Sequence, residues 1–327
     1  MNNFKKVGLT ALAGSLASIS AHAAEMTVSG ASVLTYTSED TTEVTGNPFG
    51  MKTNIGFTAS GEVNGYTVSY MQTTADQFAG MSSARLSIDM GDSGLIAFDQ
   101  GSGSGLKTID DKTPTAAEEI WDGLDGLTAG GLVGAAGSSG VWNYVNTMGG
   151  VKLNAAVRKG SGTSNADGAS SGAGQSAWDF ALTGSPMDGM SAGAGYGEAE
   201  SGETSGTGAS GENKHSTFFA NYSAGPVTAG IQMSKIDNGT ALATDEITQA
   251  WGVAFNVNEN LSVSYGQREV EFDKSNATDV TEDGNGIAIA YTMGSIKIAG
   301  NRNEVDNNGG TQGTSDAMTE IAVSFAF

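Results

Sequence analysis

The chain has 327 residues, of which 49 are glycine and only 4 are proline, so its length allows two average domains or one large β-barrel. Its formal net charge of -21 makes nucleic acid an unsuitable partner, because phosphate contacts need clusters of Lys and Arg. With no cysteine and only His22 and His215, disulfides, Cys-ligated metals and multi-histidine metal sites are excluded.

The first 23 residues predict a signal peptide. Lys5 and Lys6 form a positive start, residues 7–19 are mostly apolar and small, and Ala21-His22-Ala23 fits a cleavage site. We therefore expect residues 1–23 to be removed and the mature chain to begin at Ala24. The alternative interpretation is an N-terminal core helix. No later stretch reaches the ~18–20 apolar residues that a membrane helix needs.

After this segment, apolar and polar residues alternate over short stretches, as they do in β-strands with two different faces. In the stretch 51–61, for example, Ile55 and Phe57 fall on one face, and Lys52 and Asn54 fall on the other. We count sixteen such stretches, at 26–37, 51–61, 66–70, 81–90, 95–100, 141–147, 151–158, 178–182, 190–196, 216–222, 227–233, 247–257, 261–265, 287–293, 296–298 and 319–327.

Short Gly, Asn or Pro turns alternate with longer polar connections between these stretches. The long connections lie near 38–50, 73–80, 101–140, 160–175, 199–213, 236–246, 273–284 and 303–316. Tight turns at one end and long loops at the other are typical of transmembrane barrels. A soluble β-sandwich more often mixes connection lengths at both ends.

The polar faces of the predicted strands carry charged residues. They include Lys52, Arg85, Asp89, Lys152, Arg158, Arg268 and Lys297. Sixteen strands enclose a lumen too wide for side chains to fill, and unpaired charges are strongly disfavoured in a dry core. The pattern therefore predicts an all-β fold: one 16-stranded antiparallel transmembrane β-barrel over residues 24–327, with lipid outside and water inside.

Residues 101–140 form the longest part of the chain without a two-residue alternation. This stretch carries the acids Asp110, Asp111, Glu118, Glu119, Asp122 and Asp125. We expect it to fold into the barrel as a constriction loop. The alternative is an acidic loop exposed to solvent outside the barrel. The stretch from Thr115 to Glu118 fits a capping box and predicts a short helix through about Trp121, which would occupy Glu118 partly in capping.

The alternation within the strands places several basic residues on the inner face of the wall, where they would face the loop acids. The candidates are Lys52, Arg85, Lys152 and Arg158. Opposed charges across a narrow aqueous gap create a transverse field that disfavours apolar solutes and lets small polar solutes pass. We expect no cofactor, although clustered carboxylates in the loop leave a calcium site possible.

Four features of the chain resemble the general diffusion porins of Gram-negative outer membranes. They are the signal peptide ending at Ala23, the opening strand Glu25-Met-Thr-Val-Ser-Gly30, the acidic third long loop, and the terminal strand Glu320-Ile-Ala-Val-Ser-Phe-Ala-Phe327. The resemblance implies an outer-membrane homotrimer of sixteen-stranded barrels, each with a pore narrowed by its third loop. It also implies that the barrel-assembly machinery recognises the terminal strand ending at Phe327.

These observations predict a passive, water-filled channel for small hydrophilic solutes and ions, mildly cation-preferring and without a catalytic residue. Three alternatives stay open at this point. One is a substrate-specific channel of the same architecture, and another is an outer-membrane adhesin or structural barrel with a plugged lumen. The third is a soluble secreted β-protein of lectin type.

Overall fold

The computed structural model describes residues 25–40, 46–74, 80–124, 131–137, 139–160, 176–200, 211–239, 244–275 and 277–327. The predicted signal peptide, residues 1–23, and the loop acid Asp125 lie outside the described residues. No helix in these ranges is long and apolar enough to cross a membrane.

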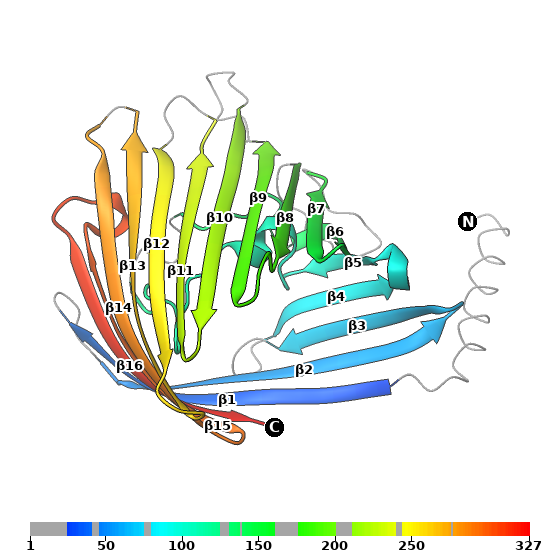
Figure 1. The fold of residues 1–327 in the computed structure, drawn as a ribbon, viewed down its shortest axis with the longest axis horizontal. Coiled ribbons are helices and arrows are strands. Elements are labelled where there is room, and N and C mark those ends of the chain that lie inside the picture. The colour runs from blue at the N-terminus through cyan, green and yellow to red at the C-terminus, as the bar shows by residue number, and fades with distance from the viewer. Residues whose placement is uncertain are drawn as a thin grey trace.

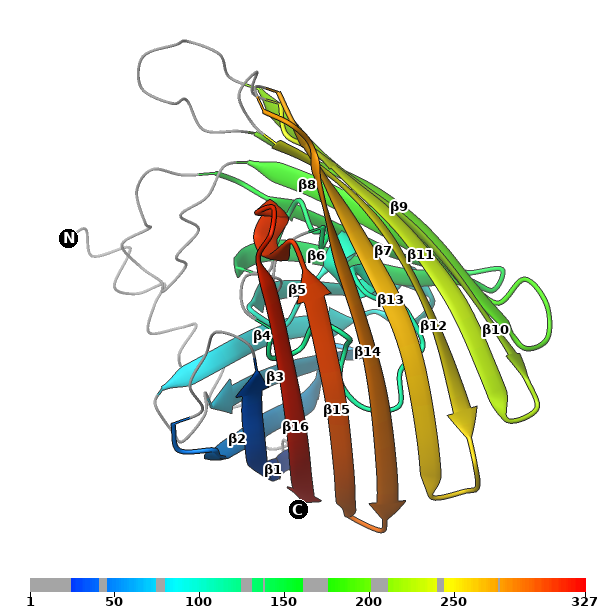
Figure 2. The ribbon, with the colours of Figure 1, turned by 90° about the vertical axis from the view of Figure 1, so that its left-hand side faces the viewer.

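Within the described residues, sixteen antiparallel strands form one closed barrel in which each strand pairs with its neighbours in sequence and β1 pairs with β16 (Figures 1 and 2). The strands are β1 (Glu25–Asp40), β2 (Phe49–Val63), β3 (Tyr66–Thr74), β4 (Met81–Asp89), β5 (Leu95–Gln100), β6 (Ser139–Met148), β7 (Val151–Arg158), β8 (Ala177–Gly184), β9 (Met190–Glu200), β10 (Glu212–Ala224), β11 (Val227–Asp237), β12 (Thr244–Asn256), β13 (Leu261–Lys274), β14 (Val280–Met293), β15 (Ile296–Asp306) and β16 (Ser315–Ala326). The predicted fold class is confirmed.

The last residue of the chain takes part in closing the barrel. Phe327 continues the pairing of β16 with β1, since Gly30 N donates to Phe327 O at 2.8 Å and Phe327 N donates to Gly30 O at 3.0 Å. The ring also covers Gly30, where a Cβ atom would lie only 2.5 Å from Phe327 Cε2. Gly30 and the terminal aromatic residue therefore fit together at the seam.

The alternation of side chains sets the outer face of the barrel. Its exposed large apolar residues include Val28, Leu34, Met51, Phe57, Leu86, Trp142, Trp178, Phe218, Ile231, Trp251, Tyr265, Ile289, Tyr291, Ile321 and Phe325. An exposed apolar band over a closed sheet suits lipid, where every backbone polar group must be satisfied within the barrel. The inner face carries the polar members of each alternation, as the sequence predicted.

Tight turns join the strands at one end of the barrel. The β2–β3 turn is Asn64-Gly65, with φ of 53° and 83°, and the β6–β7 turn is Gly149-Gly150, with φ of 57° and 84°. Two consecutive positive φ angles are what a two-residue hairpin turn requires, and Asn and Gly adopt them most easily. The longer connection between β15 and β16, residues 307–314, lies at the opposite end.

The connection between β13 and β14 is shorter than the sequence indicates. β13 extends to Lys274 and β14 begins at Val280, so the strands occupy much of the stretch 273–284 that was expected to be a loop. On β13 the acids Glu269 and Glu271 point outward, while Val270 and Phe272 are buried. The two-residue alternation therefore continues beyond the lipid-facing band, but there the acidic residues lie on the outer face and the apolar residues lie buried on the inner face.

Candidate functional site: the loop inside the barrel

The connection between β5 and β6 lies inside the barrel, as the teal segment in Figure 2 shows. We call its described residues the inner loop, with an outgoing arm (101–124) and a return arm (131–137). Polar side chains of the barrel wall hold both arms through their backbone groups. The contacts lie on the inner faces of strands from β7, beside β6, to β16.

The outgoing arm begins with a 3-10 turn, Gly105–Ile109, against β7, β8 and β9. Gly105 N donates to Asn154 Oδ1 at 2.9 Å, and Leu106 N donates to Asp179 Oδ1 at 3.0 Å. Apolar packing reinforces these bonds. The cluster consists of Leu106, Ile109, Val133, Ala181, Phe219 and Ile236. Both arms thus share one small apolar core with the wall.

Gln232 on β11 holds the middle of the outgoing arm. Its Oε1 accepts from Lys112 N at 2.6 Å, and its Nε2 donates to Ile109 O at 2.9 Å and to Asp110 O at 3.0 Å. Asn221 on β10 adds a bond from Nδ2 to Lys112 O at 2.7 Å. The backbone around Asp110 is therefore fixed to the wall by wall amides.

The far end of the outgoing arm reaches the last strands. Ser264 Oγ on β13 accepts from Ala116 N at 2.9 Å. Asn303 Nδ2 on β15 donates to Glu119 O at 3.2 Å and to Asp122 O at 2.9 Å. The apolar contacts at this end join Trp121, Leu124, Val305 and Met318. The outgoing arm thus follows the inner wall from β7 to β16.

The return arm retraces this path toward β6. Gly131 N donates to Glu246 Oε2 on β12, and Gly134 N donates to His215 Nδ1 on β10 at 3.3 Å. Ala136 N donates to Asp179 Oδ2 on β8 at 2.7 Å. The start of the outgoing arm and the end of the return arm therefore bond to the same carboxylate, that of Asp179.

The helix predicted from Thr115 through about Trp121 is wrong. Residues 111–124 form turns and bends, and Thr115 Oγ1 donates to Glu118 O at 2.7 Å instead of capping a helix. The physical reason is competition for backbone groups, because Asn303 takes the carbonyls of Glu119 and Asp122. A propensity for local helix is overridden by these contacts with the wall.

The charges of the inner loop meet wall charges near its far end. Glu118 interacts electrostatically with Lys297 on β15 and Lys52 on β2, and its acidic neighbours are Glu119 and Asp122. Near the middle of the arm, Asp110 and Asp111 lie among Lys107 and Lys112 of the loop itself, and Asp111 also interacts with Arg268 of the wall. Glu320 on β16 joins the far group, since it interacts with Lys52, Glu118 and Asp122.

The four basic residues predicted for the wall lie in different places. Lys52 lies near the loop acids. Arg85 Nη2 donates to the side-chain oxygen of Asn143 at 2.7 Å once that amide is oriented to satisfy its neighbours. Arg158 lies close to the return arm, because a Cβ atom on Gly137 would be 3.1 Å from Arg158 Nη1. Lys152 is exposed beside the β6–β7 turn, at the other end of β7.

Burial raises the pKa of four loop carboxyls, those of Asp110, Asp111, Glu118 and Glu119. A raised pKa means that protons bind at higher pH than they bind ordinary carboxyls, so acidification removes these negative charges first. As the pH is lowered from 8, we therefore expect cation preference to decline before the pH reaches about 4, the range in which ordinary carboxyls titrate. The check is the reversal potential across a KCl gradient between pH 8 and pH 4. A preference that stays constant to pH 4 would contradict this expectation.

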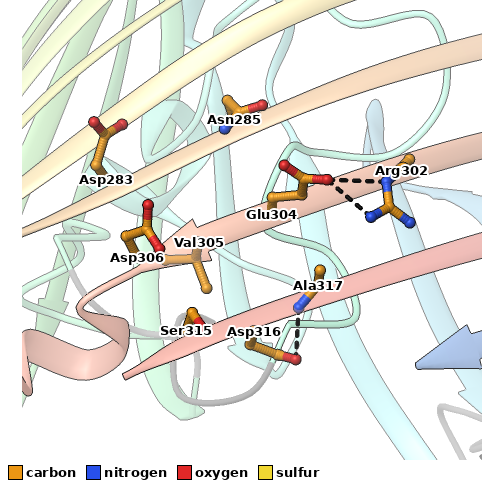
Figure 3. Close-up of a pocket in the computed structure, with 9 residues that line it drawn as sticks. All are labelled: Asp283, Asn285, Arg302, Glu304, Val305, Asp306, Ser315, Asp316 and Ala317. Atoms are coloured by element: carbon orange, nitrogen blue, oxygen red, sulfur yellow. Dashed lines mark hydrogen bonds and ion pairs between the residues drawn. The ribbon is translucent and has the colours of Figure 1, made fainter. Parts of the chain in front are cut away.

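A polar rim with Asp283, Arg302, Glu304 and Asp306, which Figure 3 draws as sticks, lies on the outer face of β14–β16. There a pocket of about 470 Å³ is lined by Asp283, Asn285, Arg302, Glu304, Val305, Asp306, Ser315, Asp316 and Ala317. Arg302 Nη2 lies 2.9 Å from Glu304 Oε1. So charged a surface cannot face hydrocarbon. In the part of the chain that the structure describes, no group of three or more His, Cys, Asp or Glu side chains could hold a metal ion.

Sequence reasoning missed several residues that hold the inner loop. The main ones are Asp179, Gln232 and Asn303. A signal was present for Asp179, because it alternates with Trp178 and Phe180 and so falls on the inner face of its strand. A lone inner carboxylate at mid-strand, opposite a long loop, is a candidate anchor. The amides carry no comparable signal, since polar residues are common on every inner face.

A family model described as Gram-negative porin matches residues 8–327. A search of curated proteins finds no match. Among solved structures, the trimer form of OmpT, an outer membrane protein of Vibrio cholerae, is similar with a TM-score of 0.68 at 14% identity, over 93% of this chain and 100% of that one. The anion-selective porin from Comamonas acidovorans is similar with a TM-score of 0.63 at 13% identity, over 93% and 100% of the two chains.

The outer membrane channel DcaP of Acinetobacter baumannii is also similar, with a TM-score of 0.65 at 15% identity over 93% and 97% of the two chains. Identities this low show the shared barrel fold alone. The family match extends over nearly the whole sequence and agrees with the closed sixteen-stranded barrel and its apolar outer band. The chain belongs to the Gram-negative porin family and is a porin channel of the outer membrane.

Proposed function

We propose that the protein is a general channel for passive diffusion of small hydrophilic solutes and ions, with a modest preference for cations. The observation that carries this proposal is the inner loop, whose acids lie inside the barrel with Lys52 and Lys297 of the wall beside Glu118. Opposed charges across water order the water between them, which disfavours apolar solutes. The loop thereby acts as a constriction that selects by size and polarity.

The balance of charge around the inner loop supports cation preference. The acids are Asp110, Asp111, Glu118, Glu119, Asp122 and Glu320, and the bases are Lys52, Lys107, Lys112, Lys297 and Arg268. Six carboxylates outnumber five cationic groups, so the local potential is negative and concentrates cations. The Comamonas porin is titled anion-selective and shares this fold, which agrees with ion preference being a property of site charges and not of the barrel.

A homotrimeric assembly fits the lengths of the strands. β5 has 6 residues, and β7 and β8 have 8 each, whereas β13 and β14 have 14 each. Crossing a bilayer takes roughly 9–11 residues of tilted strand. The wall that contains the short strands is therefore better covered by a neighbouring subunit than by lipid. The OmpT structure in trimer form offers a precedent with this fold. Recognition of the strand ending at Phe327 by the assembly machinery is part of the same proposal.

Two measurements on the purified protein test this function. In planar bilayers we expect stepwise, ohmic conductance, and in proteoliposomes we expect swelling rates that fall smoothly with the size of neutral sugars. An absence of conductance steps would contradict a channel and favour a plugged barrel. Saturable uptake of one sugar, blocked by that sugar alone, would instead show a substrate-specific channel.

A further inference from the structure

Asp179 on β8 is the one described wall residue whose side chain accepts hydrogen bonds from both arms of the inner loop. Its Oδ1 accepts from Leu106 N at 3.0 Å, and its Oδ2 accepts from Ala136 N at 2.7 Å. We propose that Asp179 is the positioning residue that fixes the inner loop in the pore and thereby keeps the channel open. This inference rests on the proposed function, in which the loop sets the conducting path.

The chemistry of the position calls for a carboxylate. Both approaching groups are backbone N–H donors, and an ionised Asp offers two acceptor oxygens and no donor. Such charge-assisted bonds are roughly twice as strong as neutral ones. The residue is only 2% exposed, so water does not replace a lost partner readily. Arg158 is close enough to interact with the carboxylate and offsets part of its buried charge.

The neighbouring backbone leaves room for this carboxylate. A Cβ atom on Gly105, whose φ is +57°, would lie 1.8 Å from Asp179 Oδ1. A Cβ atom on Gly197 of β9 would lie 2.2 Å from Asp179 Cβ. Both glycines therefore allow the close approach of the outgoing arm and of the adjacent strand. A side chain at either glycine would clash with Asp179, so both positions favour its contact with the loop.

The other anchors of the loop each hold one arm. Gln232 and Asn303 bond to the outgoing arm, whereas Glu246 and His215 bond to the return arm. Loss of any of these leaves the base of the loop in place. Loss of Asp179 removes one bond from each arm at the base of the loop, where the outgoing arm keeps only the bonds of Gly105 N to Asn154 and Asn143, so the loop can swing into the lumen.

The first test compares Asp179→Asn with Asp188→Asn. Asp188 is exposed in the short β8–β9 turn, so its substitution makes the same change in charge away from the loop. An Asn side chain keeps one acceptor but turns an NH₂ group toward the second N–H donor. Asp179→Asn thus removes one charge-assisted bond and leaves one buried N–H donor unpaired. These two effects should raise the frequency of brief closures roughly tenfold. Asp188→Asn should match the parent channel.

The second test restores the link between the arms by other means. A Cβ atom on Gly134 would lie 3.4 Å from Lys107 Cβ, near the separation of about 3.5–4.5 Å found in disulfides. The chain has no cysteine of its own, so Lys107→Cys with Gly134→Cys gives a single defined pair. In the Asp179→Asn background, oxidation should return closures to the frequency seen with the pair alone, and reduction should bring them back. A residue that only stabilised the barrel would lower its heat stability without this reversible rescue.

A third readout does not depend on ion flow. Trypsin should cut the folded Asp179→Asn protein in detergent at Lys107 or Lys112 several-fold faster than it cuts Asp188→Asn. If the parent protein passes no current, the proposed function fails and the digestion still decides the role of Asp179. If the two variants agree in both closures and digestion, Asp179 does not position the loop, while the channel function stands.

Discussion

Replacing Arg268 with alanine should destabilise the folded barrel by roughly 3–5 kcal/mol, because it leaves a buried carboxylate without its cation. Arg268 on β13 is 3% exposed, and its Nη1 lies 3.9 Å from Oε1 of Glu282, which is 1% exposed. Its guanidinium also stacks on Trp121, with 4.7 Å between Cζ and the ring centroid. The substitution therefore also removes a cation–π contact that holds the far end of the inner loop.

Arg302 on β15 supplies a matched control. Its side chain pairs with Glu304 at 2.9 Å, but the two side chains are 41% and 50% exposed. Exposed pairs contribute roughly 0–1 kcal/mol, so Arg302→Ala should change stability little. Both variants can be compared by urea unfolding in detergent or lipid. A cost for Arg268→Ala no larger than that for Arg302→Ala would show that the buried pair does not stabilise the barrel.

Replacing residues 102–137 with a short Gly-Ser linker should raise single-channel conductance about twofold or more, because a sixteen-stranded barrel without an inner element leaves a wide aqueous lumen. The barrel should still close, since β5 and β6 pair directly from Leu95 and Val145 toward the loop. Some stability should be lost, because Phe219 and Ile236 lose their apolar cover.

The deletion variant must first be shown to be folded, by heat-modifiable mobility and far-UV circular dichroism. Unchanged conductance in a folded variant would mean that the inner loop does not narrow the path. Loss of all conductance would mean that the loop is needed to keep the lumen open. Either result would contradict the role assigned to the loop.

The sequence predicts the barrel well because the alternation repeats in every strand. One polar residue between two apolar ones, such as Asp179 between Trp178 and Phe180, is enough to set the inner face. The same rule failed at the loop end of β13 and β14. There Glu269 and Asp283 point outward, and the polar stretch 273–284 predicts a loop where the strands in fact continue. Polarity marks strand faces only where lipid covers one of them.

The course of the inner loop is less predictable from sequence. It depends on single side chains of distant strands, such as Gln232 and Asn303, that bond to backbone groups with no sequence signature. The same bonds replaced the expected helix near Thr115 with turns. The position of Lys52 followed from parity, but its proximity to Glu118 depends on where the outgoing arm crosses the barrel.

The proposed cation preference depends on the acids of the inner loop. Its most direct test is the reversal potential in a KCl gradient, at about 0.1 M or below, where the Debye length is ~10 Å or more. One variant neutralises four loop acids: Asp110→Asn, Asp111→Asn, Glu119→Gln and Asp122→Asn. Its control, the rim variant, neutralises four acids exposed on the outer face of β13, β14 and β15: Glu269→Gln, Glu271→Gln, Asp283→Asn and Asp306→Asn. We expect the loop variant to lose cation preference and the rim variant to keep it. Equal shifts in both, or no shift in the loop variant, would contradict the claim.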